Sequence, residues 1–306
     1  LERDRDGGST GDTAPGPTST PADPYETFRA GRFDAAFVAL HGPGGEDGKV
    51  QGLLELAGVA YTGSSVLASA LAMDKVRTKR LLAGEGIPVA EDSVVGRAPG
   101  GALPEPARVA AIAERVGLPC VVKPGRGGSA FGTAIVRDVA SLGPALAAAL
   151  AEDPEALVES YLTGTELTCG VLGGGPHEDA LALPLTENVP VSDEFFDFRA
   201  KYTVGACNEI TPARVDPAVV ERIQDLSVRA HQALGCEGMS RSDYILTSAG
   251  PVLLEVNTIP GMTRTSLLPQ GAAAAGIGFA ALIERLLRSA MRRFEATRGT
   301  SDAGSA

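Results

Sequence analysis

The chain has 306 residues, of which 44% are hydrophobic and 21% are charged, and it carries a formal net charge of -11. This length and composition are typical of a globular enzyme with two or three subdomains, and the lack of a basic stripe argues against a nucleic-acid partner. Neither a secretory signal nor an apolar run of about 18 residues is visible, so we expect no membrane insertion and a cytoplasmic location.

The first third of the chain is expected to hold a linker and a small α/β unit. Residues 1–24 are rich in Gly, Ser, Thr, Pro and Asp, a composition typical of a linker. A short buried strand is expected at 34–40, followed by the glycine-rich loop of residues 41–48 (HGPGGEDG). Helices are expected at 50–57 and 65–83.

Strands and helices continue to alternate through the rest of the chain. The expected helices are 107–116, 142–151, 217–234 and 279–294. The expected strands are 119–123, 156–160, 166–172, 181–185 and the two arms of a hairpin within 241–257. A second glycine-rich loop (125–132) and a polar loop (193–203) lie between them. This mixture places the fold in the α/β and α+β classes.

The expected hairpin, RSDYILTSAGPVLLEVN, brings several polar side chains together. With a three-residue turn centred on Ala249, Asp243 faces Glu255 and Arg241 faces Asn257 in an antiparallel ladder. Side chains two residues apart share a face of a strand. The four polar side chains are therefore expected on one side of the hairpin.

Two carboxylates and a carboxamide on one strand face repel one another unless a cation lies between them. Mg²⁺ prefers such hard oxygen ligands and usually also binds substrate phosphates. The pattern therefore predicts a metal site at Asp243, Glu255 and Asn257. The alternative is a solvated polar face on an edge hairpin, with Arg241 as the counter-charge.

Lysine is used sparingly, and the five positions that keep it are Lys49, Lys75, Lys79, Lys123 and Lys201. A compact ammonium and a planar guanidinium are not interchangeable, so these positions merit inspection. Lys123 opens the loop KPGRGGSAFG, whose glycines let backbone N–H groups wrap an anion. Taken alone, this loop and the one beginning at His41 are also compatible with ordinary turns, and Lys75 and Lys201 with exposed surface lysines.

Six segments, taken in order, resemble the D-alanine–D-alanine ligase family of the ATP-grasp superfamily. They are LHGPGGEDG (40–48), QGLLELAGVAYTGSSVLASALAMDK (51–75), VVKPGRGGSAFG (121–132), FDFRAKY (196–202), SRSDYIL (240–246) and LLEVNTIPGMTRTSLLP (253–269). The resemblance implies an ATP-grasp fold behind an incomplete N-terminal α/β domain. The implied divisions are a partial N-terminal domain (1–69), a central ATP-binding subdomain (70–158) and a C-terminal ATP-grasp subdomain (159–306).

The resemblance implies a two-step ligation for peptidoglycan precursor synthesis. The carboxylate of one D-alanine attacks the γ-phosphate of ATP, giving an acyl phosphate and ADP, and the amino group of a second D-alanine then displaces phosphate. A pair of Mg²⁺ or Mn²⁺ ions is implied at Asp243, Glu255 and Asn257, and a homodimer is usual in the family. Nucleotide contacts are implied for Lys75 and Lys123 (phosphates), Glu159 (adenine), Glu166 (ribose) and Lys201 (transferred phosphate).

The same resemblance implies roles in catalysis. Arg241 and the backbone N–H of Gly261 stabilise charge that develops on the carbonyl oxygen. Ser129 and Tyr202 tie a closing loop to the second glycine-rich loop, which keeps water from the acyl phosphate. The implied substrate-binding residues are His41, Ser266 and Leu267, the last through its backbone N–H.

Two departures from the family leave alternatives open. The second glycine-rich loop reads GRGGSAF where the family more often has additional serines and an acidic residue. The family's opening strand, loop and helix, with a glutamate for the first D-alanine, has no match, so we expect a missing βα unit of roughly 30 residues and weak ligation.

The alternatives are a related carboxylate–amine ligase, such as a D-alanine–D-lactate or natural-product dipeptide ligase, and an inactive nucleotide-binding relative. By resemblance, Lys201 and Tyr202 favour an amine nucleophile over lactate. Retention of the phosphate and metal residues argues against an inactive relative, and the missing glutamate argues for one.

Overall fold

The computed structural model describes residues 23–29, 33–101, 103–127, 132–176, 178–190 and 207–302. Their helices are α1 (Pro24–Arg29), α2 (Lys49–Ala57), α3 (Val66–Met73), α4 (Lys75–Gly84), α5 (Pro106–Val116), α6 (Val139–Glu152), α7 (Pro217–Ala233), α8 (Leu267–Ala274) and α9 (Phe279–Asp302). Their strands are β1 (Ala35–Ala36), β2 (Ala60–Tyr61), β3 (Asp92–Gly96), β4 (Cys120–Pro124), β5 (Ala134–Val136), β6 (Glu155–Ser160), β7 (Thr165–Gly173), β8 (Leu181–Ala182), β9 (Thr186–Pro190), β10 (Cys207–Ile210), β11 (Gly238–Thr247) and β12 (Gly250–Asn257).

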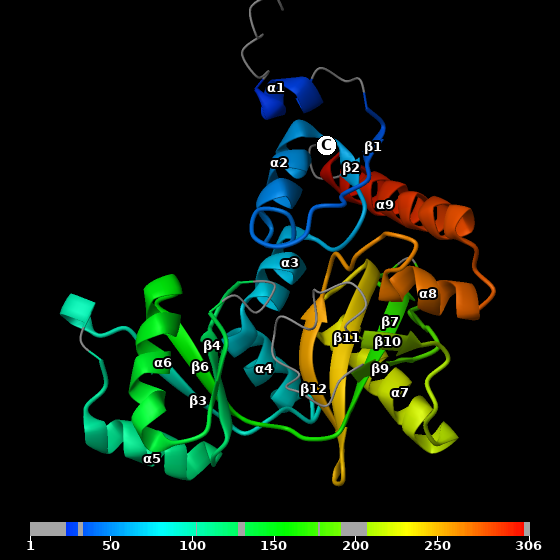
Figure 1. The fold of residues 1–306 in the computed structure, drawn as a ribbon. Coiled ribbons are helices and arrows are strands. Elements are labelled where there is room, and N and C mark those ends of the chain that lie inside the picture. Colours follow the sequence, from blue (N-terminus) through cyan, green and yellow to red (C-terminus); the bar gives the residue numbers. More distant parts are fainter. Residues whose placement is uncertain are drawn as a thin grey trace, which may run out of the picture.

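A four-stranded antiparallel sheet in the order β3-β6-β4-β5 lies at the lower left of Figure 1. Helices α5 and α6 pack against one face, where Val122 and Val158 join their hydrophobic core. Successive side chains along a strand point to opposite faces, so Lys123 and Glu159 lie on the other face. This second face carries Asp92, Lys123 and Glu159, and Lys79 of α4 contacts two of them.

A larger antiparallel sheet has the order β10-β9-β7-β11-β12, with β8 beside β7. Helix α7 covers one face, where Ile223 and Leu226 belong to the same core as Leu167 and Tyr244. Asp243 precedes Tyr244 in β11 and therefore points to the opposite face. The polar faces of the two sheets thus border a common region.

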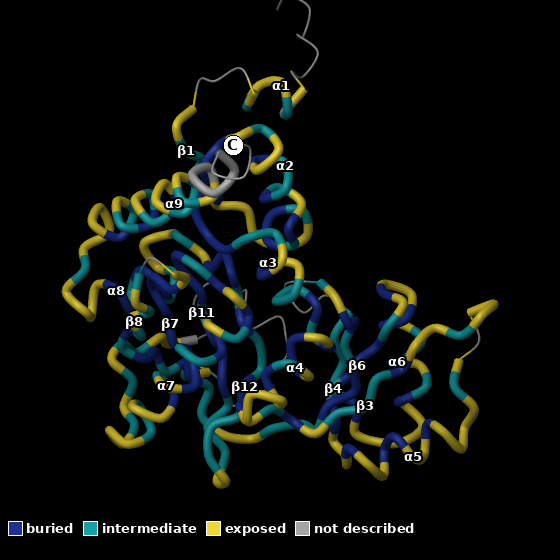
Figure 2. The backbone as a smooth tube through the Cα atoms, turned by 180° about the vertical axis from the view of Figure 1, so that it is seen from behind, coloured by how far each residue is buried: buried dark blue, intermediate teal, exposed yellow. Residues whose placement is uncertain are grey.

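Helices α3 and α4 run between the two sheets in both views (Figures 1 and 2). A single helix was expected at 65–83, and this prediction is wrong because the helix breaks at Asp74. Asp74 leaves the helical conformation (φ -90°, ψ 96°), and its carboxylate accepts the N–H of Arg77 at 3.0 Å. Aspartate is a favoured N-cap, so the break starts a new helix at Lys75.

The N-terminal part contains β1 paired in parallel with β2. Its core joins Val38, Leu54 and Tyr61 to Leu282 and Leu286 of α9, so the end of the chain packs against the beginning of the described part. In Figure 2 the dark-blue, buried stretches follow the strands of the six-stranded and the four-stranded sheet, which form the interior of the molecule.

Several other expectations can be compared with the structure. The helices expected at 50–57, 107–116 and 217–234 are confirmed as α2, α5 and α7. The strand expected at 181–185 is wrong in extent, because β8 ends at Ala182 and β9 begins at Thr186. Within the described ranges no single helix is long and apolar enough to cross a membrane, and α8 with the first part of α9 meets these criteria only as a pair bent by 106°.

Candidate active site

The hairpin of β11 and β12 has the predicted register at its polar end. Arg241 lies opposite Asn257, and Asp243 lies opposite Glu255. The turn contains two residues rather than the predicted three, and a β-bulge that leaves Leu254 unpaired restores the register. The predicted pairs are confirmed, although a tighter turn and a bulge produce them.

Asp243 is buried, with 4% of its surface exposed, and several neighbours satisfy its carboxylate. Arg241 donates to it through Nε at 3.0 Å and Nη2 at 2.8 Å. Thr168 Oγ1 donates at 2.9 Å, and Asn257 Nδ2 lies 3.4 Å away. These contacts offset the cost of burying the charge. Arg241 is thus the counter-charge of Asp243, as the alternative interpretation of the hairpin required.

The same donor set also suits a hard divalent cation. Asp243 and Glu255 bring two carboxylates, and Asn257 a carboxamide, to one end of two paired strands. In the part of the chain that the structure describes, no three His, Cys, Asp or Glu side chains gather as a metal cluster. A cation here would therefore need the Asn257 oxygen and substrate phosphate oxygens to complete its ligands.

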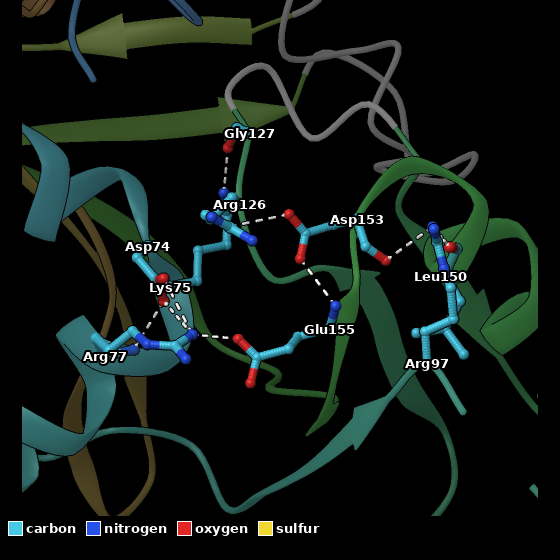
Figure 3. Close-up of polar contacts among 9 residues, drawn as sticks. All are labelled: Asp74, Lys75, Arg77, Arg97, Arg126, Gly127, Leu150, Asp153 and Glu155. Carbon is cyan, nitrogen blue, oxygen red and sulfur yellow. Dashed lines mark hydrogen bonds and ion pairs between the residues drawn. The ribbon is translucent and has the colours of Figure 1, made fainter. Parts of the chain in front are cut away.

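Lys75 begins α4 and contacts the second glycine-rich loop (Figure 3). Its backbone N–H donates to the carbonyl of Gly125 at 2.9 Å, and its ammonium donates to the carbonyl of Gly127. Burial lowers the pKa of Lys75, and the negative charge of Glu255 acts in the opposite direction. Lys75 is therefore held against the second glycine-rich loop and is not an exposed surface lysine.

Charged contacts hold the base of this loop against its neighbours (Figure 3). Arg126 Nε lies 3.1 Å from Asp153 Oδ2, and Asp153 Oδ1 accepts the N–H of Glu155 at 2.9 Å. The Glu155 carboxylate pairs with Arg77 of α4, which also lies 3.1 Å from Asp74. The loop base is thereby fixed between α4 and the corner where α6 leads into β6.

The four-stranded sheet contributes a buried carboxylate shared by two lysines. Oε1 of Glu159 accepts a hydrogen bond from Lys79 Nζ at 2.6 Å, and Oε2 pairs with Lys123 Nζ. Burial alone would raise the pKa of Glu159, but the charges of Lys123 and Lys79 together outweigh it and lower the pKa. Lys123 is therefore held as half of an ion pair with Glu159, directly before the second glycine-rich loop.

Glu166 lies on the polar face of the larger sheet. It pairs in register with Asn188 of β9, whose Nδ2 donates to Glu166 Oε1 at 3.2 Å. The same Nδ2 lies 3.4 Å from Thr168 Oγ1, and Thr168 donates to Asp243. A continuous polar network therefore joins Glu166 to the predicted metal ligands.

A pocket lies where the N-terminal glycine-rich loop meets α4 and the hairpin. It is lined by His41, Glu46, Ala72, Met73, Lys75, Gly127, Glu255, Val256, Asn257 and Thr258. His41 Nδ1 lies 3.4 Å from Oε2 of the buried Glu46, and this contact raises the pKa of His41. The pocket thus brings together residues predicted separately for phosphate, metal and substrate binding.

The residues predicted to bind the second substrate lie at the start of α8. Ser266 precedes Leu267, the first residue of α8, but its Oγ accepts from the N–H of Thr263 at 3.0 Å instead of capping the helix. A Cβ on Gly261 would lie 2.8 Å from Ser266 Oγ, so only glycine allows this approach. The N–H groups at a helix N-terminus attract carboxylates, which agrees with the predicted role of Leu267.

Two family profiles match the chain. The profile described as D-ala D-ala ligase C-terminus matches residues 81–288, and that described as D-ala D-ala ligase N-terminus matches residues 6–64. The D-alanine--D-alanine ligase of Syntrophobacter fumaroxidans is 46% identical over 263 residues, which cover 86% of this chain and 82% of that protein. The chain belongs to the D-alanine–D-alanine ligase family.

Solved structures of D-alanine–D-alanine ligases and a relative share the fold. The Bacillus anthracis D-alanine--D-alanine ligase complexed with ATP gives a TM-score of 0.71 at 31% identity, over 87% of this chain and 81% of that chain. The VanG D-Ala:D-Ser ligase of Enterococcus faecalis gives 0.74 at 36% identity, over 84% and 73%. The predicted ATP-grasp fold is confirmed. The N-terminal profile begins at residue 6, before the first segment that resembles the family, which begins at Leu40.

Three of the predicted site residues lie outside the described part of the chain, and two residues near the site were not predicted. Ser129, Lys201 and Tyr202 lie outside the described residues, so their roles stay predictions. Lys79 was not predicted as a site residue, although the scarcity of lysine pointed to it as strongly as to Lys75. Glu46 was also missed, and its signal was an acidic residue within a glycine-rich loop.

Proposed function

We propose that the chain joins two D-alanines into D-alanyl-D-alanine with ATP as co-substrate, as a step in peptidoglycan precursor synthesis. The observation that carries this proposal is the pocket beside α4, where Lys75 lies with Glu255 and Asn257. Lys123 lies on the neighbouring four-stranded sheet, paired with Glu159. Basic groups for phosphates opposite oxygen donors for a cation are what an ATP-dependent ligase requires.

In the first step, a carboxylate oxygen of one D-alanine forms a bond to the γ-phosphorus, and the bond to the ADP oxygen breaks. Lys75 and Lys123 bind the phosphates and balance their charge, and Glu159 and Glu166 bind the adenine and the ribose. Asp243, Glu255 and Asn257 would hold Mg²⁺ or Mn²⁺, which would supply positive charge beside the phosphates when bound.

In the second step, the amino group of another D-alanine bonds to the acyl carbon, phosphate leaves and the amine loses a proton. Arg241 and the N–H of Gly261 stabilise the negative charge on the carbonyl oxygen. Ser266 and the N–H of Leu267 hold the carboxylate of the second D-alanine, which orients its amino group. The proximity of Gly261 to Ser266 supports this arrangement.

Further roles rest on the family resemblance. His41 takes part in binding the first D-alanine, supported by its place in the pocket. Lys201 reaches the transferred phosphate, and Ser129 and Tyr202 link the loops that close over the site. We also infer that the protein is cytoplasmic and that it forms a homodimer. Light scattering after gel filtration would test the homodimer.

A phosphate-release assay with ATP and Mg²⁺ tests the function, with mass spectrometry of the products. We expect D-alanine alone to give phosphate and D-alanyl-D-alanine, and L-alanine to give neither. D-serine and D-lactate are tested as second substrates, since the similar VanG protein is a D-Ala:D-Ser ligase. Preference for either over D-alanine would change the proposed substrate, and ATP binding without turnover would indicate an inactive relative.

A further inference from the structure

Lys79 is the second lysine of α4, and it has no part in the function described so far. It lies four residues after Lys75, so both ammonium groups extend from one side of the helix. Only 6% of its surface is exposed, which is rare for lysine unless the charge is paired. A buried lysine one helical turn from a predicted phosphate-binding lysine requires an explanation.

The partners of Lys79 come from two neighbouring strands of the four-stranded sheet. Its Nζ lies 2.6 Å from Glu159 Oε1 in β6 and 3.7 Å from Asp92 Oδ1 in β3. Asp92 and Glu159 are directly paired in the sheet, so Lys79 lies against both carboxylates on one face. The contact joins α4 to this sheet.

Glu159 divides its two oxygens between two lysines. Oε1 contacts Lys79, and Oε2 contacts Lys123, which lies diagonally across from Glu159 in β4. The exposed fractions of the three side chains are 7% for Lys79, 8% for Glu159 and 13% for Lys123. Lys123 is the most exposed of the three, and it precedes the glycine-rich loop.

The electrostatics of this trio constrain nucleotide binding. Lys123 cannot turn toward ATP phosphates without loosening its contact with Glu159. Removing the only cation from a buried carboxylate is costly, because the remaining charge is left unpaired in the interior. If Lys123 were the only cation beside Glu159, it would therefore be hard to release toward the phosphates. A second, permanent cation on the other oxygen removes most of this penalty.

We propose that Lys79 is a positioning residue for nucleotide binding, which holds Glu159 so that Lys123 is available to the ATP phosphates. The inference rests on the proposed function in one respect, namely that Lys123 contacts the phosphates. The role assigned to Lys79 requires no contact with ATP or D-alanine. Its effect is exerted through Glu159, and it should therefore depend on the charge of Glu159.

A double-mutant cycle tests this dependence. Calorimetric titration with a non-hydrolysable ATP analogue and Mg²⁺ compares the wild-type chain with Lys79→Met, Glu159→Gln and the double variant. We expect Lys79→Met to weaken binding by about tenfold or more when Glu159 is charged, and by less than about threefold in the Glu159→Gln background. In turnover, Lys79→Met should raise KM for ATP while kcat changes little.

Arg115→Met is the matched control. Arg115 forms an ion pair with Glu91 at 3.0 Å in the same part of the molecule, but both side chains are more than half exposed. Its removal should leave nucleotide affinity unchanged. Equal losses from Lys79→Met in both backgrounds would show that Lys79 merely packs α4 against the sheet and would overturn the proposal.

Two further outcomes are distinguishable. If the wild-type chain does not bind the analogue, the proposed function fails. If it binds but Lys79→Met binds equally well, only the inference about Lys79 fails. Should Lys79→Met not fold, Lys79→Gln keeps a donor for Glu159 without the charge, and the same dependence on Glu159 is expected with a smaller loss. Equal losses in both backgrounds would again overturn the proposal.

Discussion

Buried titratable side chains are accommodated in three different ways in this structure. Asp243 has Arg241 two residues away on the same strand, whereas Glu159 depends on lysines from α4 and β4. His231 of α7 is buried without a carboxylate partner in the contacts of its ring, and it is accommodated in its neutral form. These side chains respond differently to substitution and to pH.

Glu255→Ala should abolish metal-dependent ATP turnover while the fold persists. Glu255 pairs with Asp243 in register, so its removal takes away half of the carboxylate donors without opening the core. Phosphate release across a Mg²⁺ titration measures the effect, and circular dichroism checks the fold. Glu284→Ala is the control, because Glu284 forms an exposed pair with Arg288 on α9. Unchanged turnover in Glu255→Ala would remove the metal site.

His231 should make stability depend on pH below neutrality. Its Nδ1 lies 2.7 Å from Ser240 Oγ and its Nε2 3.2 Å from the carbonyl of Gly173, and burial lowers its pKa from 6.5 to about 4. The unfolded chain takes up the proton first, so the stabilisation is complete above pH 6.5 and is lost as the pH falls toward 4, by about 3 kcal/mol.

Urea unfolding of the wild-type chain and His231→Gln, measured between pH 7.5 and 4.5, tests this dependence. Glutamine keeps a hydrogen-bonding group but does not titrate, so the variant should lose less stability on acidification than the wild type. Parallel pH profiles for the two proteins would mean that other groups cause the loss.

Helix α4 matters to the site because its first turn anchors the second glycine-rich loop. Asp74 ends α3, caps α4 and contacts Arg77, and the next residue donates its backbone N–H to Gly125. The break between the two helices therefore places Lys75 beside the loop. A continuous helix would have no cap at this point.

Asp74→Ala should cost about 1 kcal/mol of stability, as loss of an N-cap does, and should also raise KM for ATP several-fold. Asp138→Ala is a matched control, because Asp138 caps α6 by accepting the N–H of Ser141 at 2.8 Å. Chemical denaturation should show similar losses in both variants. Only Asp74→Ala should raise KM for ATP. If Asp74→Ala and Asp138→Ala have the same KM for ATP, the α4 cap has no role in nucleotide binding.

The chain that leaves α4 packs against the larger sheet before it enters the four-stranded sheet. Ile87 is 2% exposed and belongs to the core of the larger sheet and α7. The N–H of Leu253 in β12 donates to the carbonyl of Pro88 at 2.8 Å. The division of the chain at residues 69 and 158 stays a prediction, and these contacts bear on where α4 belongs.

Ile87→Ala should destabilise the larger sheet by about 2–5 kcal/mol because it leaves a cavity in that core. Hydrogen exchange should speed up in α7, β11 and β12 while the four-stranded sheet keeps its protection. Leu67→Ala, which truncates a side chain that is 76% exposed on α3, should change neither region. Faster exchange in the four-stranded sheet alone would place Ile87 in the other core.

The sequence alone determined the features that depend on short separations. The pairing of Asp243 with Glu255 follows from a hairpin whose two strands are adjacent in the chain. This predicted pairing is confirmed, although the turn is shorter than expected and a bulge was not expected. The helices α2, α5 and α7 follow from local periodicity. Ordered motifs indicated the family, and the family profiles and relatives confirmed it.

Only the tertiary structure decided which isolated charges meet. Lys79 and Glu159 are 80 residues apart, and Lys75 and the carbonyl of Gly127 are 52 apart. Their contacts depend on how α4 packs between two sheets, and a local pattern of residues contains no information about that packing. In sequence, Lys75 and Lys79 therefore resemble surface lysines. Contacts with partners far away in the sequence are what distinguish them from exposed lysines.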